Sequence, residues 1–329
     1  MKRKLAAMLL PGACLIVGAL QASAVAEAPL RKYRPVWSLA GKVTALGSGT
    51  FEQQLTRLAD NFQHIYRGVE VAVEKSATVE APLALASGRA QIGVMSRSMT
   101  RAESARVEEK SGASPAGFPV ALDALAILVN AENPIRCLSL SQIDAIFSAN
   151  RLMADGKVVA SWGDLGLSGD WQGKSPVAIG RRAGSNTTEF LRNAILGGDV
   201  LRSGVTLLDD GRAVAAAVAA DKHAIGYSSI GFLNSGVRAV PIATPGEGCV
   251  EPTAENVVRG RYPLTRSLYL YLAHSPDPRL NAIGVEFVRY VLSREGQLEL
   301  LESGLAPVGR DVQDINDRKL KAFRGRRGL

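Results

Sequence analysis

One short pattern occurs twice in this chain and constrains its fold more than any other feature. Gly-Ser-x-Thr stands between an apolar strand-like run and a helix-like apolar period, first as "GSGT" at 47–50 and again as "GSNT" at 184–187. A strand that leads through a short turn into a helix is the unit of α/β folds. The sequence therefore predicts an α/β protein built from strand–turn–helix units.

The residues around the first turn continue this alternation. Thr50 stands where a helix is expected to begin, and Gln53 follows three residues later, which is the pattern of a capping box. Hydrophobic periodicity predicts the elements that follow. The expected strands lie within 41–50, 69–76 and 91–98, and the expected helices within 51–68 and 78–87.

Two α/β lobes account for the order of all the expected elements. Lobe 1 is discontinuous and comprises residues 36–120 and 274–329, whereas lobe 2 comprises residues 121–273. The chain is expected to cross between the lobes near Val120 and near Ala273. Each lobe should contain a mostly parallel sheet flanked by helices.

Two segments are expected to be less regular. Residues 151–175 are loop-rich and give only a weak hairpin signal. The basic end of the chain, "KLKAFRGRRGL" at 319–329, reads as a solvated tail.

The first 24 residues are typical of a cleaved secretory signal peptide. Basic residues at 2–4 precede an apolar run, and small residues at 22–24 suit cleavage. The run is shorter than the roughly 20 residues that span a bilayer, which argues against a membrane anchor. Lipid attachment at Cys14 is a second alternative, although Pro11 stands where an aliphatic residue is usual. We expect a periplasmic or secreted protein.

Charge and cysteine content exclude several classes of function. The formal net charge is +8, but no clustered basic face or motif indicates nucleic-acid binding. Cys137 and Cys249 remain after cleavage, and an isolated pair in an oxidising compartment is more often bridged than reactive, with two buried thiols as the alternative. The histidines are too widely spaced for a metal site, so we expect no metal and no cofactor.

The chemistry of the turns points to an anion. Helix N-termini present N–H groups and a partial positive charge, glycine allows close approach, and Ser or Thr hydroxyls add donors. Turns at 74–78 and 95–98 also end strands, and Arg181 and Arg182 add guanidinium groups that suit a tetrahedral oxyanion. Turns at the carboxyl ends of strands from both lobes would clamp one oxyanion.

In these residues the chain resembles the periplasmic phosphate-binding proteins that serve ABC importers. The resemblance runs from about residue 43 to residue 308. Six segments carry it in the same order: "GSGTF", "IGVMSRSM", "NPIRCLSLSQIDAIFS", "GRRAGSNTTEF", "AIGYSSIGF" and "RYPLTRSLYLYL".

The resemblance implies a type II periplasmic-binding-protein fold, in which two lobes close about hinge segments over a ligand, without catalysis. It also implies a phosphate or related oxyanion ligand and delivery to a membrane ABC permease; we expect a monomer. Carried over residue by residue, it implicates Ser48, Gly49, Thr50, Phe51 (through its N–H), Ser76, Ser96, Arg97, Arg181, Ser185, Asn186 and Thr187.

Several positions depart from the pattern of well-known members. Arg97 and Ala183 stand where those members have Asp, whose carboxylate accepts a proton from bound phosphate. Asn186 replaces the usual Gly, and "SAT" at 76–78 replaces a glycine-rich turn. Loss of the carboxylate acceptors weakens the argument for phosphate against sulfate.

Two other functions are alternatives. A sensor or adhesion module on the same fold would be consistent with the altered residues and the basic C-terminus. A hydrolase with Ser48 or Ser185 as nucleophile has less support, because neither serine lies in a Gly-x-Ser-x-Gly elbow.

Overall fold

The structure is a computed structural model that describes residues 30–36 and 38–325. The expected signal peptide at 1–24 lies outside these residues. In the part of the chain that is described, every helix is too short or too polar to cross a membrane.

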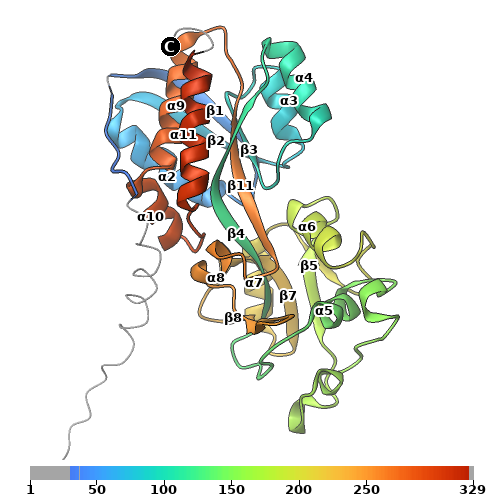
Figure 1. The fold of residues 1–329 in the computed structure, drawn as a ribbon. Coiled ribbons are helices and arrows are strands. Elements are labelled where there is room, and N and C mark those ends of the chain that lie inside the picture. Colours follow the sequence, from blue (N-terminus) through green and yellow to red (C-terminus); the bar gives the residue numbers. More distant parts are fainter. Residues whose placement is uncertain (1–29, 37, 326–329) are drawn as a thin grey trace, which may run out of the picture.

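A continuous sheet of nine strands runs through the described part of the molecule (Figure 1). Its order is β2-β1-β3-β11-β4-β7-β5-β6, and β8 pairs with β4. The bounds are β1 (Ala40–Ser48), β2 (Gly68–Ser76), β3 (Ile92–Met95), β4 (Ala116–Asn130), β5 (Val177–Arg181), β6 (Thr206–Leu208), β7 (Ala224–Ser229), β8 (Val237–Val240) and β11 (Thr265–Leu272), with β9 (Ile242–Thr244) and β10 (Gly248–Val250) as a separate antiparallel pair.

Strand direction differs between the ends of this sheet and its middle. β1 is parallel to β2 and β3, and β5 is parallel to β6 and β7. β11 is antiparallel to β3 and β4, and β4 is antiparallel to β7 and β8. The expected parallel strands are therefore present at both ends, and antiparallel strands lie between them because β4 and β11 carry the chain across in opposite directions.

Helices cover both faces of the sheet. Along β1, Val43 and Ala45 belong to a core shared with α2 and α9, whereas Leu46 packs with Ala84 of α3, as the alternating pleat of a strand requires. The helices are α2 (Glu52–Ile65), α3 (Glu80–Ala86), α4 (Arg101–Ser111), α5 (Leu140–Phe147), α6 (Asn186–Ala194), α7 (Gly211–Ala220), α8 (Ala254–Val258), α9 (Pro278–Val291), α10 (Arg294–Glu302) and α11 (Arg310–Gly325), with η4 (Ile230–Phe232) a short 3-10 helix.

Two large apolar cores are found among the described residues, and β4 contributes to both. One core lies around β1–β3 and includes Phe62, and the other lies around β5 and β7 and includes Trp162. β4 passes from the first to the second between Ala121 and Ala124. We call the elements around the first core (β1–β3, α2–α4, α9–α11) the first half, and those around the second (β5–β10, α5–α8) the second half.

Residues 151–175 are loop-rich, as the sequence predicts, and the weak hairpin signal does not correspond to strand pairing. In their described positions they make short 3-10 helices, η1 (Leu152–Ala154), η2 (Trp162–Leu165) and η3 (Gly169–Trp171). The rings of Trp162 and Trp171 meet edge to face with centroids 6.0 Å apart. Burial of Trp162 in the second core organises this segment without strand pairing.

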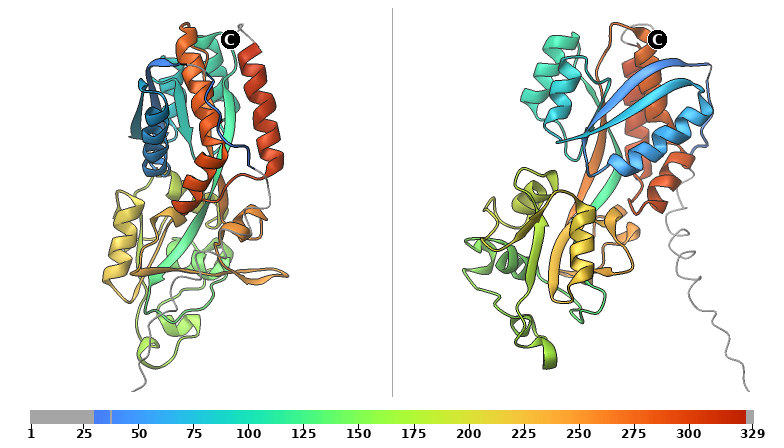
Figure 2. Two further views of the ribbon diagram at one scale, coloured as in Figure 1. Left: turned by 90° about the vertical axis from the view of Figure 1, so that its left-hand side faces the viewer. Right: turned by 180° about the vertical axis from the view of Figure 1, so that it is seen from behind.

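The expectation of a solvated C-terminal tail is wrong for residues 319–325. These residues complete α11, in which Leu320 and Phe323 are buried in the first core. Figure 2 shows α11 packed along the side of the first half. Lys319 and Lys321 are exposed on this amphipathic helix, whereas Arg324 is half-buried and pairs with Glu286, so their charge did not indicate disorder.

The disulfide favoured by the sequence is confirmed. Cys137 and Cys249 are bonded, with their Cα atoms 5.9 Å apart. The bond ties the segment before α5 to β10 within the second half.

Candidate functional site

The first Gly-Ser-x-Thr turn lies at the carboxyl end of β1 and leads into α2. α2 begins at Glu52, and among the described residues no side chain caps it, so the capping box expected from Thr50 and Gln53 is wrong. The Phe51 N–H, which the resemblance implicates in ligand binding, donates to the Ser48 carbonyl at 3.1 Å. Ser48 and Thr50 are only 1% and 5% exposed. An uncapped helix N-terminus thus lies beside two buried hydroxyl residues.

The neighbouring strand ends bring further hydroxyls to this edge. Ser76 ends β2 in register with Ser48 of β1, and the Gly49 N–H donates to the Ser76 carbonyl at 3.2 Å. Ser96 directly follows β3, is buried, and shares a hydrogen bond of 3.2 Å with the Thr78 hydroxyl. The expected hydroxyl residues of the first half therefore gather at the carboxyl edge of the parallel strands.

Arg97 does not join this group. Its guanidinium donates two hydrogen bonds to the Glu103 carboxylate on α4, at 2.8 and 2.7 Å, and a third to the Ser98 carbonyl. The hydrogen bond from Arg97 is the main cause that lowers the pKa of Glu103 to about 2. The charge of Arg97 is thus engaged by α4.

The second Gly-Ser-x-Thr turn is built differently. Ser185 is the N-cap of α6, and its hydroxyl accepts a hydrogen bond of 3.1 Å from the Thr188 N–H. Gly184 before it adopts a φ of +79°, which favours glycine. The N–H groups of Asn186 and Thr187 remain at the open end of the helix.

Arg181 ends β5 beside this turn. Its Nη2 donates to the Asp209 carbonyl at 2.7 Å, but its buried Nε has no hydrogen-bond partner among the described residues. Burial lowers the pKa of the Arg181 guanidinium, and the positive charge of Arg266 lowers it further against the opposing charge of Asp210. Arg182 points elsewhere and pairs with the exposed Asp209 carboxylate. Arg181 is therefore a half-buried cation whose buried Nε has unused donor capacity.

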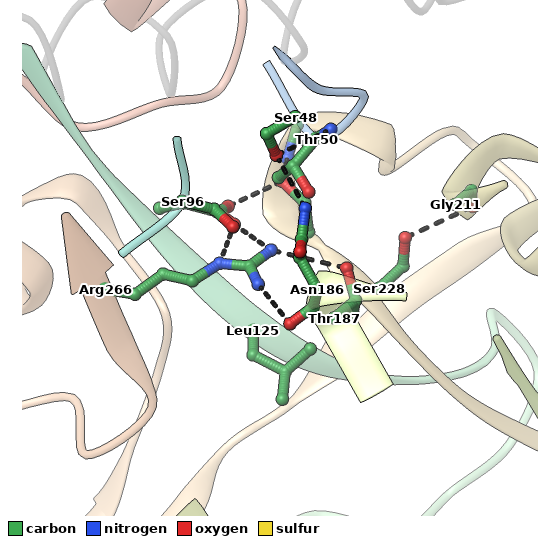
Figure 3. Close-up of polar contacts among 12 residues, drawn as sticks. Ser48, Thr50, Ser96, Leu125, Asn186, Thr187, Gly211, Ser228 and Arg266 are labelled. Atoms are coloured by element: carbon green, nitrogen blue, oxygen red, sulfur yellow. Dashed lines mark hydrogen bonds and ion pairs between the residues drawn. The ribbon is translucent and has the colours of Figure 1, made fainter. Parts of the chain in front are cut away.

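A second cation, Arg266, is buried and was not expected from the sequence. Its side chain is 4% exposed, and it pairs with Asp123, which is fully buried, through Nε and Nη2 at 2.9 and 2.8 Å. Its Nη1 donates to the Asn186 carbonyl at 3.2 Å, and its Nη2 lies 3.4 Å from the Thr187 hydroxyl (Figure 3). Arg266 thus joins the crossing strands β11 and β4 to the start of α6.

The sequence signal for this pair is weak. Arg266 is a single charged residue in the alternating strand "TRSLYLYL", and Asp123 is a single charged residue in an apolar run. The two residues are direct partners in the antiparallel register of β11 and β4, although they are 143 positions apart. A charge inside a predicted buried strand was the only available indication.

The two turns contact each other directly. The Asn186 Nδ2 donates to the Ser48 Oγ at 3.2 Å across the gap between the halves (Figure 3). Nearby, the Arg212 Nη2 of α7 donates to the Gln53 Oε1 of α2 at 2.8 Å. Segments far apart in the sequence therefore meet at one place.

This site offers many donors and few acceptors. Its carboxylate, Asp123, already accepts hydrogen bonds from Arg266 on one oxygen and from Ser229 on the other at 2.5 Å. Hydroxyls, helix N-termini and two arginines suit a compact anion held by hydrogen bonds. Within residues 30–36 and 38–325, no group of three or more His, Cys, Asp or Glu could hold a metal ion.

Comparisons with known proteins agree on one kind of relative. A family model described as "PBP superfamily domain" matches residues 25–295. The phosphate-binding protein PstS of Pseudomonas aeruginosa PAO1 is 35% identical over 299 residues, which cover 91% of this chain and 93% of that protein. Protein SphX of Synechococcus elongatus is 26% identical and covers 81% of this chain and 77% of that protein.

Solved structures share the fold. A putative phosphate ABC transporter substrate-binding protein from Clostridium perfringens, with bound phosphate, aligns with a TM-score of 0.67 at 23% identity, covering 82% of this chain and 100% of that chain. An ABC-type phosphate transport receptor from Vibrio cholerae aligns with a TM-score of 0.62 at 20% identity, covering 80% of this chain and 99% of that chain.

Proposed function

The chain belongs to the PBP superfamily and, within it, to the phosphate-binding proteins of ABC importers, and from this premise we propose that it captures inorganic phosphate or a related tetrahedral oxyanion outside the cytoplasm. It acts by binding, without catalysis, and passes its ligand to an ABC permease. The monomeric state remains a prediction.

The first and second halves are the two lobes of this receptor, and β4 and β11 are its hinge. The separate cores on either side of Ala121–Ala124 support this division. We propose a return crossing near Leu264, where the sequence led us to expect Ala273, and the pairing of β11 with β3 and with the first part of β4 supports this choice. Two strands that pass between cores can bend without disturbing either one.

The ligand lies between the two Gly-Ser-x-Thr turns. Ser48, Thr50 and Ser96 with the N-terminus of α2 form one wall, and Thr187 with the N-terminus of α6 forms the other. Arg181 supplies the positive charge, and Arg266 supplies guanidinium donors whose charge is balanced by Asp123. The observation that carries this proposal is the meeting of both turns at the Asn186–Ser48 contact, beside an Arg181 Nε that has no partner among the described residues.

Phosphate is the first ligand to test, with arsenate and sulfate as competitors. Arg97, which stands where well-known relatives carry Asp, is held by Glu103 and supplies no acceptor. Hydroxyls are the remaining acceptors for a ligand proton, so we expect weaker discrimination between phosphate and sulfate than a carboxylate would give.

The test is calorimetric titration of the mature protein after removal of bound ions. We expect one site for phosphate. Thr50→Val should weaken binding about 10- to 100-fold, because a hydrogen bond to a charged group contributes roughly 1.5–3 kcal/mol. Thr56→Val, on the exposed side of α2, is the matched control and should bind as wild type. An absence of heat with phosphate, arsenate and sulfate would overturn the proposal.

A further inference from the structure

We propose that the first turn of α2 couples oxyanion binding to lobe closure through Gln53 and Gln54, whose partners Arg212 and Gly231 lie on the opposite lobe. Arg212 and Gly231 are then positioning residues, which affect affinity without touching the ligand. This inference rests on the proposed function, since it concerns how the same site closes.

Gln53 makes the contact on one side of the turn. Its Oε1 accepts a hydrogen bond of 2.8 Å from the Arg212 Nη2, and both side chains are exposed. Arg212 is fixed at the start of α7, where the Asp210 side chain caps the helix by accepting from the Ala213 N–H at 2.8 Å. The contact therefore joins the N-termini of two helices that belong to different lobes.

Gln54 makes the contact on the other side. It is 2% exposed, and its Nε2 would lie 2.9 Å from a Cβ placed on Gly231 of η4. A Cβ on Gly304, which follows α10, would lie 3.2 Å from the Gly231 Cα. Two glycines thus allow the backbones of opposite lobes to touch beside Gln54, and a side chain at Gly231 would hold the lobes apart.

The surroundings make this glycine contact a narrow one. A cavity of about 1090 Å³ lies beside it and is lined by both lobes, including Gln54, Gly231 and Gly304. The backbones of the two lobes therefore approach closely at Gly231 next to open space, so a side chain at Gly231 would meet the opposite lobe there.

Both contacts sit on the turn that follows Thr50, a proposed ligand group. An oxyanion that binds Thr50 and the N-terminus of α2 in the closed arrangement gains affinity from every contact that favours that arrangement. Loss of the hydrogen bond between Gln53 and Arg212, or a larger residue at Gly231, should raise the population of an open arrangement of the lobes. Binding should weaken in proportion to the loss of the closed population.

The experiment combines affinity with a distance between lobes. Spin labels on Val79→Cys and Val200→Cys, exposed positions of the first and second lobe, report the interlobe distance with and without phosphate. We expect Arg212→Ala and Gln53→Ala each to raise the Kd for phosphate about 5- to 10-fold, and the double variant to add little more. The exposed Arg259→Ala on the second lobe is the control and should change neither quantity.

Gly231→Val tests the second contact and should give the longest label distance in the presence of phosphate. If it fails to fold, Arg212→Ala decides the question, because its exposed side chain is not needed for either core. Unchanged Kd and unchanged label distance in Arg212→Ala would overturn the inference. If wild type binds no oxyanion, the proposed function fails, and label distances in ligand-free protein still test the closure contacts.

Discussion

The two Gly-Ser-x-Thr turns have the same residues and different structures. In the second turn, Ser185 caps the helix that begins at Asn186. In the first turn, the helix begins four residues after Ser48, and among the described residues no side chain caps it. The same short pattern therefore yields a capped helix end in one half and an uncapped end in the other.

The difference extends to charge. The second turn lies against two arginines, of which Arg266 is neutralised by Asp123 and Arg181 keeps unused donors. The first turn contributes buried hydroxyls. Arg97 follows β3 in the same half, but it is paired with Glu103. The first turn therefore supplies neutral donors to the site, and the second turn lies beside its positive charge.

The largest expected difference between the two turns is in the stability lost when the first glycine of each turn is replaced by alanine. Gly47 has a φ of +146°, and an added Cβ would lie 2.0 Å from the Val94 carbonyl oxygen of β3. Gly184 has a φ of +79°, with nothing among the described residues within 4 Å of its Cβ position. We expect Gly47→Ala to lower the free energy of unfolding by about 3 kcal/mol or more, and Gly184→Ala by only about 1 kcal/mol. Urea unfolding measures both, and equal losses would contradict the comparison.

Substitution of two adjacent arginines tests which of them supplies positive charge to the site. Arg181→Ala should reduce phosphate affinity about 10- to 100-fold, because it removes a buried charged donor worth roughly 1.5–3 kcal/mol. Arg182→Ala should change affinity less than about twofold, since its partner Asp209 is exposed and such pairs contribute little. Calorimetric titration of both variants compares them, and a larger loss for Arg182→Ala would reverse our assignment.

The two serines separate capping from binding. Ser185→Ala should lower the free energy of unfolding by about 1 kcal/mol through loss of the α6 cap. Ser48→Ala removes the acceptor of the Asn186 amide, so its main effect should be weaker phosphate binding. Thermal unfolding and titration are both required, and a larger stability loss in Ser48→Ala would show that the turns are not specialised in this way.

The smallest expected effect is the stability lost when the Arg97–Glu103 pair is broken. The pKa of Glu103 is lowered to about 2, so the pair stabilises the fold above the ordinary Glu pKa of about 4.3. That stabilisation is lost as the pH falls from there toward 2. Glu103→Gln should cost at most about 1 kcal/mol near neutral pH, since Arg97 is partly exposed and solvent screens the pair.

The same variant tests whether Arg97 belongs to the binding site. The difference from wild type should shrink in acid unfolding between about pH 4 and pH 2. Phosphate affinity at neutral pH should be unchanged. A severalfold change in affinity would place Arg97 among the ligand groups.

Local pattern was enough for most secondary structure in the first half. The strands within 41–50, 69–76 and 91–98 are present as β1, β2 and β3, because alternation of strand and helix is a property of neighbouring residues. The helix after the first turn was also expected, but its start was misplaced. Ser and Thr precede helices both as caps and as turn residues, and the sequence does not distinguish these uses.

What the sequence by itself determined is the α/β architecture and the hydroxyl residues that end the strands, and it favoured the disulfide between Cys137 and Cys249. The tertiary structure alone decided that Arg266 and Asp123 pair, that Arg97 is bound by α4, and that α11 packs on the first core. Periodicity and turn chemistry act over a few residues, whereas these outcomes depend on which strands become neighbours. A guanidinium binds whichever carboxylate the fold brings within reach, and neither residue type nor spacing along the chain specifies that partner.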